Sequence, residues 1–397
     1  MKQVRRNILL LALCQAVMMT GGSLLITSSA VVGAMLTDER ALATLPLALQ
    51  FLSSMFTSIP ASFAMNRWGR RAGFLFSTIV GAAGGATAAW AIWLGDFWLF
   101  CVGTALVGVF NGFGIYYRFA AVDAAPDFYK GRAISYVMAG GVVAAFAGPN
   151  LANLAKDAIP AATFAGSYAA LVLLYGIAML ALLGVKIPRQ PAVKRHESGR
   201  PLLQILRQPV FMVALLGATL GYGVMSLVMT ATPLAMQGCG LPFSDSAFVI
   251  QWHVFAMFAP SFVTGTLIRR FGVLTVMLWG ASCYVGTVFI NLNGITIDHF
   301  WIALFLLGIG WNFLFIGGTT LLTEAYLPEE KAKAQALNDF LVFTTVSLSS
   351  LSAGALQYHY GWEAVNLGVI PLIAVIVIAV VALMLRRRLQ AAEAVAP

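Results

Sequence analysis

Four side chains that could bind a soft metal ion occur as two pairs in the second half of the sequence. Met225 and Met229 lie four residues apart in one long apolar run, and His253 and Met257 lie four apart in the next. Residues at positions i and i+4 share one face of a helix, so each pair would present two donors on one side. Thioether sulfur and imidazole nitrogen are ligands that copper(I) prefers. The spacing therefore predicts a copper(I) site built from neutral ligands.

The two runs would also bring the pairs to matching depths. One short connection separates them, so the two helices run antiparallel. Met229 and His253 lie 7 and 8 residues from the ends of their runs. At roughly 1.5 Å of rise per residue, Met229 would be level with His253, and Met225 level with Met257 one turn deeper.

His253 is the residue of this group that inert packing explains least. It is the only histidine deep within an apolar run, and ionisable groups at such positions are costly and usually functional. Two simpler interpretations stay open. The methionines could only fill apolar space, and His253 could only make a hydrogen bond between helices.

Composition indicates a membrane protein. The 397 residues are 60% hydrophobic and only 10% charged, which leaves too little polar surface for a water-soluble globule. Apolar runs of about twenty residues recur along the chain, and each is long enough to cross a bilayer as a helix. We predict an all-α membrane protein with twelve transmembrane helices, centred near residues 22, 52, 83, 110, 144, 175, 222, 256, 284, 312, 346 and 374. The four cysteines contain no CxxC pair and predict packing rather than disulfides.

The net charge of +9 predicts orientation and not nucleic-acid binding. Of the Lys and Arg residues, 21 fall at the termini or in even-numbered loops and only two, Arg40 and Lys156, in odd-numbered loops. By the positive-inside rule both termini face the cytoplasm, which predicts a multi-pass protein of the bacterial cytoplasmic membrane.

The sequence repeats itself. A polar, proline-rich stretch divides six spans from six, and the pairs Phe110-Asn111 and Trp311-Asn312 recur 201 residues apart. We predict an N-terminal six-helix bundle (1–187), a cytoplasmic linker (188–208) with a short surface helix near 201–207, and a C-terminal six-helix bundle (209–397). Parallel repeats of this kind form transporters whose substrate site lies between the halves.

The loop between spans two and three identifies a family. Its residues 62–71, with Arg67-Trp68-Gly69-Arg70-Arg71, resemble the loop motif of the major facilitator superfamily, although Ser62 and Asn66 replace the usual Gly and Asp. The segment 265–272 is a degenerate second copy. The resemblance covers essentially the whole chain and implies a secondary carrier that works by alternating access.

The superfamily resemblance also implies charge pairs that lock the cytoplasmic side when it is closed. Arg67 or Arg70 would pair with Asp123, and Arg270 with Glu324, while Arg118 is the remaining charge within a span. Asp339 could join such a lock or cap its helix. The alternative is that these charges only orient the protein in the membrane.

Within the superfamily, the Met225, Met229, His253 and Met257 pattern is similar to the ligand set of the CcoA-type copper importers. That resemblance implies import of copper for cytochrome oxidase assembly, with copper as the substrate and no permanently bound cofactor. It also implies a cytoplasmic copper chaperone as a partner, and we expect a monomer. Met236, Cys239, His299 and His359 are further donors that could line the entry path or be bystanders.

Two rival functions stay open. One is a carrier of an organic solute such as riboflavin, a substrate of a sister branch, or a drug; aromatic residues near the predicted cavity, including Tyr222, Trp252 and Trp311, would suit a ring. The other is a copper-binding membrane sensor that transports nothing. No enzyme motif is present, and because no phosphate-binding loop occurs, the chain cannot itself use ATP.

Overall fold

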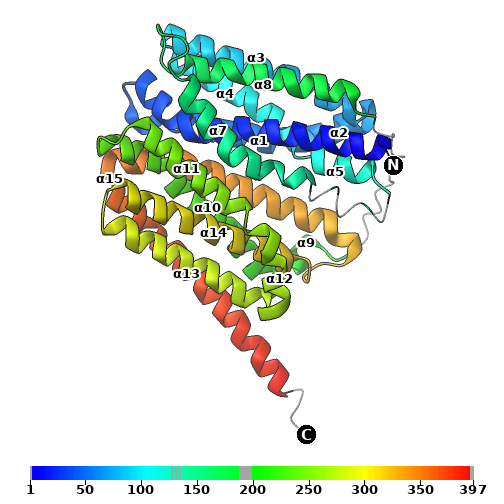
Figure 1. Ribbon diagram of the computed structural model, residues 1–397. Helices are drawn as coiled ribbons and strands as arrows, with labels where there is room; N and C mark the ends of the chain where they lie inside the picture. Colours follow the sequence, from blue (N-terminus) through cyan, green and yellow to red (C-terminus); the bar gives the residue numbers. More distant parts are fainter. Residues whose placement is uncertain (1, 127–128, 130–132, 134–135, 187–198, 394–397) are drawn as a thin grey trace.

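The computed structural model describes all residues except 1, 127–128, 130–132, 134–135, 187–198 and 394–397. The fold is all-helical, and Figure 1 shows two groups of helices, one above the other. The first group contains α1 (Lys2–Leu36), η1 (Arg40–Leu42), α2 (Leu45–Trp68), α3 (Arg70–Leu94), α4 (Phe97–Gly114), α5 (Tyr117–Asp123), α7 (Gly140–Ala155) and α8 (Ala165–Gly184). The second contains α9 (Leu202–Leu206), α10 (Pro209–Gly238), α11 (Phe243–Phe258), α12 (Ser261–Phe271), α13 (Val273–Leu292), α14 (Ile297–Leu322), η3 (Pro328–Glu330) and α15 (Lys331–Glu393).

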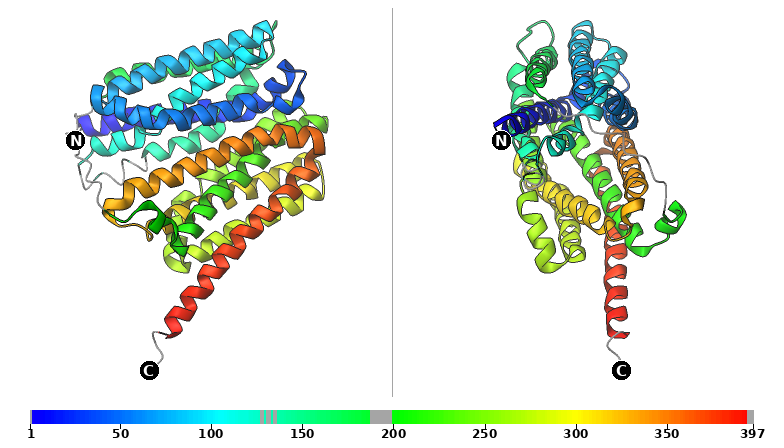
Figure 2. Two further views of the ribbon diagram at one scale, coloured as in Figure 1. Left: turned by 180° about the vertical axis from the view of Figure 1, so that it is seen from behind. Right: turned by 90° about the vertical axis from the view of Figure 1, so that its right-hand side faces the viewer.

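The described helices account for the predicted spans. Ten are long and apolar enough to cross a membrane, and α11 and α12, bent by 45° around Pro260, together form one more. The long α15 contains Gly361 at φ 79°, a left-handed conformation that divides it into two limbs. Figure 2 shows the second limb crossing back at an angle and projecting beyond the bundle. Counting both limbs gives the twelve spans expected from the sequence.

Glycine ends the second span of each half in the same way. Gly69, between α2 and α3, has φ 91° and ψ 150°, and Gly272, between α12 and α13, has φ 85° and ψ 149°. Only glycine adopts such dihedral angles without strain, so the two copies of the loop motif build the same turn.

Each half has its own core, and the outer surface is apolar. Apart from Ala145 of α7, which packs with the second half, the two large buried clusters divide between the first and the second group of helices. Leu154, Leu173 and Leu180 are 72–80% exposed on the outside of the first half. Such leucines would be unfavourable in water and suit contact with lipid tails.

Contacts within each half reveal the register of the repeat. Gly108 lies against the Gln50 carbonyl in the first half, as Gly308 lies against the His253 carbonyl in the second. The partners on α2 and α11 are 203 residues apart, whereas those on α4 and α14 are 200 apart. The structural mate of Asn111 is therefore Trp311, and the sequence-based pairing, offset by 201, is wrong by one residue at this point.

Two helix contacts occur at equivalent positions in both halves, but the large side chain and the glycine it packs against are on opposite helices in the two halves. Gly81 on α3 lies against Phe110, whereas Tyr284, the mate of Gly81, lies against Gly310, the mate of Phe110. In the same way Met18 on α1 lies against Gly114.

The mates of this second pair, Gly221 and Leu314, meet with the sizes reversed. This contact extends the 203-residue register to α1 and α10, so Gly22 is the mate of Met225 and Met19 that of Tyr222.

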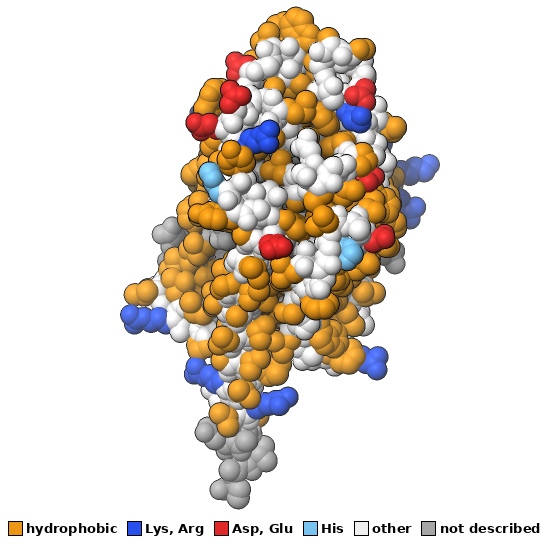
Figure 3. Space-filling model, turned by 90° about the vertical axis from the view of Figure 1, so that its left-hand side faces the viewer, with side chains coloured by type: hydrophobic (Ala, Val, Ile, Leu, Met, Phe, Trp, Pro, Cys, Tyr) orange, Lys and Arg blue, Asp and Glu red, His pale blue; other side chains and the backbone are white. Residues whose placement is uncertain are grey.

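The halves touch at the end of the bundle where α1 ends, which Figure 3 views face on. Thr44 Oγ1 donates to the Leu351 carbonyl at 3.2 Å and accepts from Gly354 N–H at 3.1 Å. Asn150 on α7 donates to the Gln251 side chain on α11 at 2.6 Å. Hydrogen bonds thus join the two groups of helices at this end.

Candidate functional site

His253 is held in one orientation by α14. Its side chain has no exposed surface, and Nδ1 lies 2.7 Å from the Leu304 carbonyl. A carbonyl can only accept, so Nδ1 carries the hydrogen and Nε2 presents a lone pair. Nε2 is buried and has no hydrogen-bond partner among the described residues. A buried acceptor without a partner is unfavourable, and a backbone carbonyl on the other ring nitrogen is the arrangement typical of metal-binding histidines.

The three methionines are buried in the same apolar cluster as this end of α11. Met225, Met229 and Met257 are 1%, 2% and 6% exposed, and all three belong to the core of the second half. None of them faces lipid.

Helix contacts give the levels of the four side chains. Gly221 lies against Leu314 and Gly318 against Ala218, so α10 and α14 run antiparallel and Met225 falls opposite residues near 310. On the other side of α14, the His253 carbonyl lies against Gly308.

One turn further along α11, the Met257 carbonyl accepts from Asn312 Nδ2 at 2.7 Å. By these contacts Met229 falls opposite residues near 306, within one turn of His253, and Met225 falls opposite residues near 310, between the levels of His253 and Met257. However, α14 lies between the two helices along most of their length, and α10 and α11 touch directly over few residues.

A metal ion at this place would depend on sulfur. In the described part of the chain, no group of three or more His, Cys, Asp or Glu side chains is arranged to hold a metal ion. By structural register the mates of His253 and Met257 are Gln50 and Ser54, so the donor set belongs to one half only. The assignment of Met225, Met229, His253 and Met257 as copper ligands stays a prediction.

The further donors proposed for an entry path do not form one group. Met236 is fully buried and accepts a hydrogen bond from Ser246 Oγ at 3.6 Å, whereas Cys239 is exposed. His299 Nδ1 pairs with Thr296 Oγ1 at 2.8 Å on the surface, and His359 lies against the rings of neighbouring tyrosines. We therefore assign no metal path to them.

An aromatic wall stands where the second half meets the first. Trp311 and Phe315 on α14 stack nearly parallel, with centroids 5.0 Å apart and an 8° angle between planes. Tyr222 and Phe258 meet Trp311 edge-on at 5.2 and 5.9 Å. Phe51 from α2 of the first half packs on the buried cluster formed by Ala218, Val342 and Val346, as do Tyr222 and Phe315. Such a surface suits the face of a flat ring.

A cavity lies beyond this wall, between the halves at the end where α1 ends. Its volume is about 400 Å³, and both halves line it. Arg40 comes from the first half, and Gln237 and Gln357 from the second. None of the four predicted metal ligands lines it, so this cavity is not the predicted metal site.

The predicted charge locks are partly rearranged. Arg70 Nε lies 2.5 Å from Asp123 Oδ2, so Arg70 is the predicted partner that makes this pair, and Arg67 makes no ion pair with any described residue. Glu324 does not pair with Arg270 as predicted. It accepts from Arg387 Nη2 at 2.6 Å, because the second limb of α15 returns past it.

The two remaining cations of this group make ring contacts. Arg270 lies over the ring of Phe271 at 5.2 Å. Arg118 lies over Phe119 at 4.8 Å and is within electrostatic range of Asp339 in the other half.

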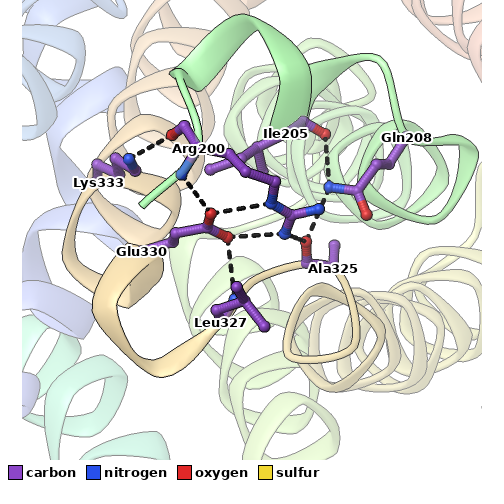
Figure 4. A network of polar contacts seen from close by, with 7 residues as sticks. All are labelled: Arg200, Ile205, Gln208, Ala325, Leu327, Glu330 and Lys333. Atoms are coloured by element: carbon purple, nitrogen blue, oxygen red, sulfur yellow. Dashed lines mark hydrogen bonds and ion pairs between the residues drawn. The ribbon is translucent and has the colours of Figure 1, made fainter. Parts of the chain in front are cut away.

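Sequence reasoning missed one polar network entirely. Arg200, which follows the undescribed part of the linker, donates to Glu330 in η3, and Lys333 Nζ donates to the Arg200 carbonyl (Figure 4). Gln208 reaches the Ala325 carbonyl beside it. The available signal was the cluster of Glu324, Glu329 and Glu330 in a loop that also carries Lys331 and Lys333.

The comparisons with known proteins agree with this architecture. Residues 11–292 match the model of the Major Facilitator Superfamily, and the chain belongs to that superfamily. It is 42% identical over 395 residues to the riboflavin transporter RfnT of Brucella anthropi, covering 98% of each chain. It is also 28% identical to the uncharacterized transporter YdeG of Bacillus subtilis, over 84% of this chain and 80% of the other.

Solved structures show the same fold at low sequence identity. A point mutant of the nucleoside transporter NupG is similar with a TM-score of 0.74 at 13% identity, covering 95% of this chain and 99% of the other. A D-xylose–proton symporter is similar with a TM-score of 0.74 at 12% identity, covering 93% and 96%. The protein is therefore a multi-pass membrane transporter. None of these relatives is named as a copper importer, so the resemblance to the CcoA type gains no support from them.

Proposed function

We propose that the protein carries a flat, polar aromatic solute of the riboflavin class across the bacterial cytoplasmic membrane by alternating access. The observation that carries this proposal is the 42% identity to a riboflavin transporter over nearly the whole of both chains. The wall formed by Tyr222, Phe258, Trp311 and Phe315 supports it, because a fused ring system gains stacking and edge contacts from such a surface. We further propose that both termini face the cytoplasm, from the distribution of Lys and Arg.

Uptake in a riboflavin auxotroph that lacks its own transporter tests this proposal. Cells expressing the protein are expected to accumulate riboflavin and grow at concentrations at which control cells do not. Trp311→Leu should reduce uptake at least tenfold without loss of protein from the membrane. No riboflavin-dependent growth at normal expression would refute the assignment.

Copper is the second candidate substrate, and His253 is the observation that favours it. The fixed imidazole with a free lone pair, in the same half as three buried thioethers on α10 and α11, fits a soft monovalent ion better than it fits inert packing. In this proposal Met225, Met229, His253 and Met257 bind copper(I) as transported substrate.

Two substitutions at the predicted copper ligands distinguish copper transport from riboflavin transport. His253→Gln and Met257→Leu keep side-chain volume but remove ligands. They are expected to abolish copper accumulation, measured by elemental analysis of cells, and to leave riboflavin uptake intact if copper is a separate substrate. Unchanged copper content with and without the wild-type protein would eliminate copper.

A further inference from the structure

Open space lies beside α1 at mid-membrane. A Cβ added at Gly22 would meet no atom within 4 Å, although the residue is half-buried and lies in the middle of the first span. Its neighbour Gly21, by contrast, is closed off by the Tyr175 ring. The space is therefore on one particular side of α1.

That side of α1 faces the other half. Met19, three residues before Gly22, comes within 3.1 Å of the position a Cβ would take at Gly141, and Phe258 of the second half comes within 3.0 Å of the same point. Ile26, four residues after Gly22, packs on the cores of both halves. Residues at these spacings share one helix face, so the space beside Gly22 opens towards the interface.

Asn111 of α4, a half-buried residue with a buried side-chain oxygen, lies beside this space. Met18 lies against Gly114, and α1 and α4 run antiparallel, so Asn111 falls level with Gly21, the residue next to Gly22. On α4, Gly114 faces α1 and Gly112 faces Ser54 of α2. Asn111 lies between them on the helix circumference, on the side towards the other half. Its structural mate there is Trp311.

Asn312, the residue that the sequence repeat pairs with Asn111, holds helices together through hydrogen bonds, whereas the Asn111 side chain makes no such bond with any described residue. Asn312 donates to the Met257 carbonyl and to Ser261 Oγ at 2.7 Å, and accepts from Thr264 at 2.6 Å. Asn111 Oδ1 is buried and accepts no hydrogen bond from any described residue.

Gln15 lies one turn before Met19 on the same face of α1, and its side-chain oxygen also lacks a hydrogen-bond partner among the described residues. The residue is 7% exposed. Buried amide oxygens without partners are rare in structures and indicate a missing ligand or water.

We propose that Asn111 and Gln15 bind the hydrogen-bonding edge of the carried solute in the space beside Gly22, while Trp311 contacts its ring face. This inference rests on the proposed function and deepens it, since it assigns the polar half of the site to the N-terminal bundle. A solute with N–H or O–H donors next to its ring would satisfy both free oxygens, and the amide NH2 groups could donate to its carbonyls. The imide and hydroxyl groups of riboflavin supply such donors.

Substitution of the two asparagines separates binding from structure. Asn111→Leu is expected to raise the KM for riboflavin uptake about fivefold to tenfold, the loss of one neutral hydrogen bond, with an unchanged melting temperature. Asn312→Leu breaks three internal hydrogen bonds and should lower the melting temperature instead. An unchanged KM in Asn111→Leu with active wild-type protein would overturn the proposal.

Filling the space gives a second, independent measurement. Gly22→Leu should abolish uptake, whereas Gly176→Leu, at another helical glycine with nothing within 4 Å, should not. In a background without other cysteines, Gly22→Cys should react quickly with N-ethylmaleimide, and riboflavin should slow the reaction.

The labelling rate of the Gly22→Cys thiol tests whether the space beside Gly22 is open, even if riboflavin is not the substrate. Absence of uptake by the wild-type protein would refute the proposed function alone. A Gly22→Cys thiol that reacts as slowly as a single buried Cys14 would refute the open site itself.

Discussion

Arg200 and Glu330 form a two-point ion pair that joins the linker to the start of α15. Arg200 Nε lies 2.9 Å from Oε1 and Nη2 2.7 Å from Oε2, and the backbone N–H groups of Arg200 and Leu327 also donate to this carboxylate. The Glu330 side chain has no exposed surface, while Arg200 keeps 38% of its side-chain surface in solvent. Bidentate pairing of this kind fixes geometry as well as charge.

Breaking this pair from the arginine side should be the more harmful change. Arg200→Ala leaves a buried carboxylate with backbone donors only, whereas Glu330→Gln keeps a neutral acceptor for the same donors. We expect a lower melting temperature for Arg200→Ala than for Glu330→Gln in purified protein. Arg207→Ala, a nearby arginine without a described ion pair, is the matched control and should melt like the wild type.

The contribution of the pair should not vary with pH near neutrality. Hydrogen bonds from the Arg200 side chain and then from Leu327 N–H lower the pKa of Glu330 from 4.5 to about 2. A lowered pKa gives stability that is complete above the unfolded value and is lost as the pH falls towards 2. The melting-temperature difference between wild type and Glu330→Gln should therefore be constant from pH 8 to 6 and shrink below pH 4.5. A difference that changes between pH 8 and 6 would contradict this.

Gly308 should tolerate no side chain. A Cβ there would lie 2.6 Å from the His253 carbonyl and 2.8 Å from Ala256 Cβ, so α14 would have to move away from α11. We expect Gly308→Ala to destabilise the protein by about 1–3 kcal/mol, seen as a lower melting temperature. Gly368→Ala, at a helical glycine with nothing within 4 Å, should melt like the wild type. Equal melting of both variants would show that the two helices are not tightly packed.

Thr44 should keep the end of the bundle near the cavity closed. Its hydroxyl both donates to Leu351 and accepts from Gly354, and Thr44→Val removes both bonds at nearly constant volume. Labelling of Gln357→Cys by an impermeant maleimide should become several times faster in this background. Thr44→Ser should restore slow labelling, and Thr78→Val, which loses a hydroxyl that contacts only groups of the first half, should not affect it. Equal rates in all variants would show that other contacts close this end.

The sequence could predict the elements of the fold because each leaves a local signal. Apolar runs predicted the spans, and the two copies of the loop motif predicted equivalent connections, in which Gly69 and Gly272 have nearly the same dihedral angles. The register of Asn111 was wrong by one because identical letters were matched, whereas the contacts of Gly108 and Gly308 define the true mates.

Long-range partners left no such signal. Glu324 pairs with Arg387, 63 residues away, because Gly361 redirects α15, and no spacing rule predicts that contact. For the candidate site, the sequence predicted which residues sit deep in α10 and α11. It could not predict that the Leu304 carbonyl would fix the imidazole of His253, since that depends on how α14 packs.

In the contact Gly81–Phe110 the glycine is on α3, whereas in the equivalent contact Tyr284–Gly310 it is on α14, so the two halves have diverged in how their helices pack. Each half has compensated its own substitutions, so a helix borrowed from one bundle would clash or leave a void in the other. A tandem duplicate of either half should therefore still fold, while an exchange of α3 for α13 alone should fail. The two halves have kept the same fold, but their individual helices can no longer be exchanged.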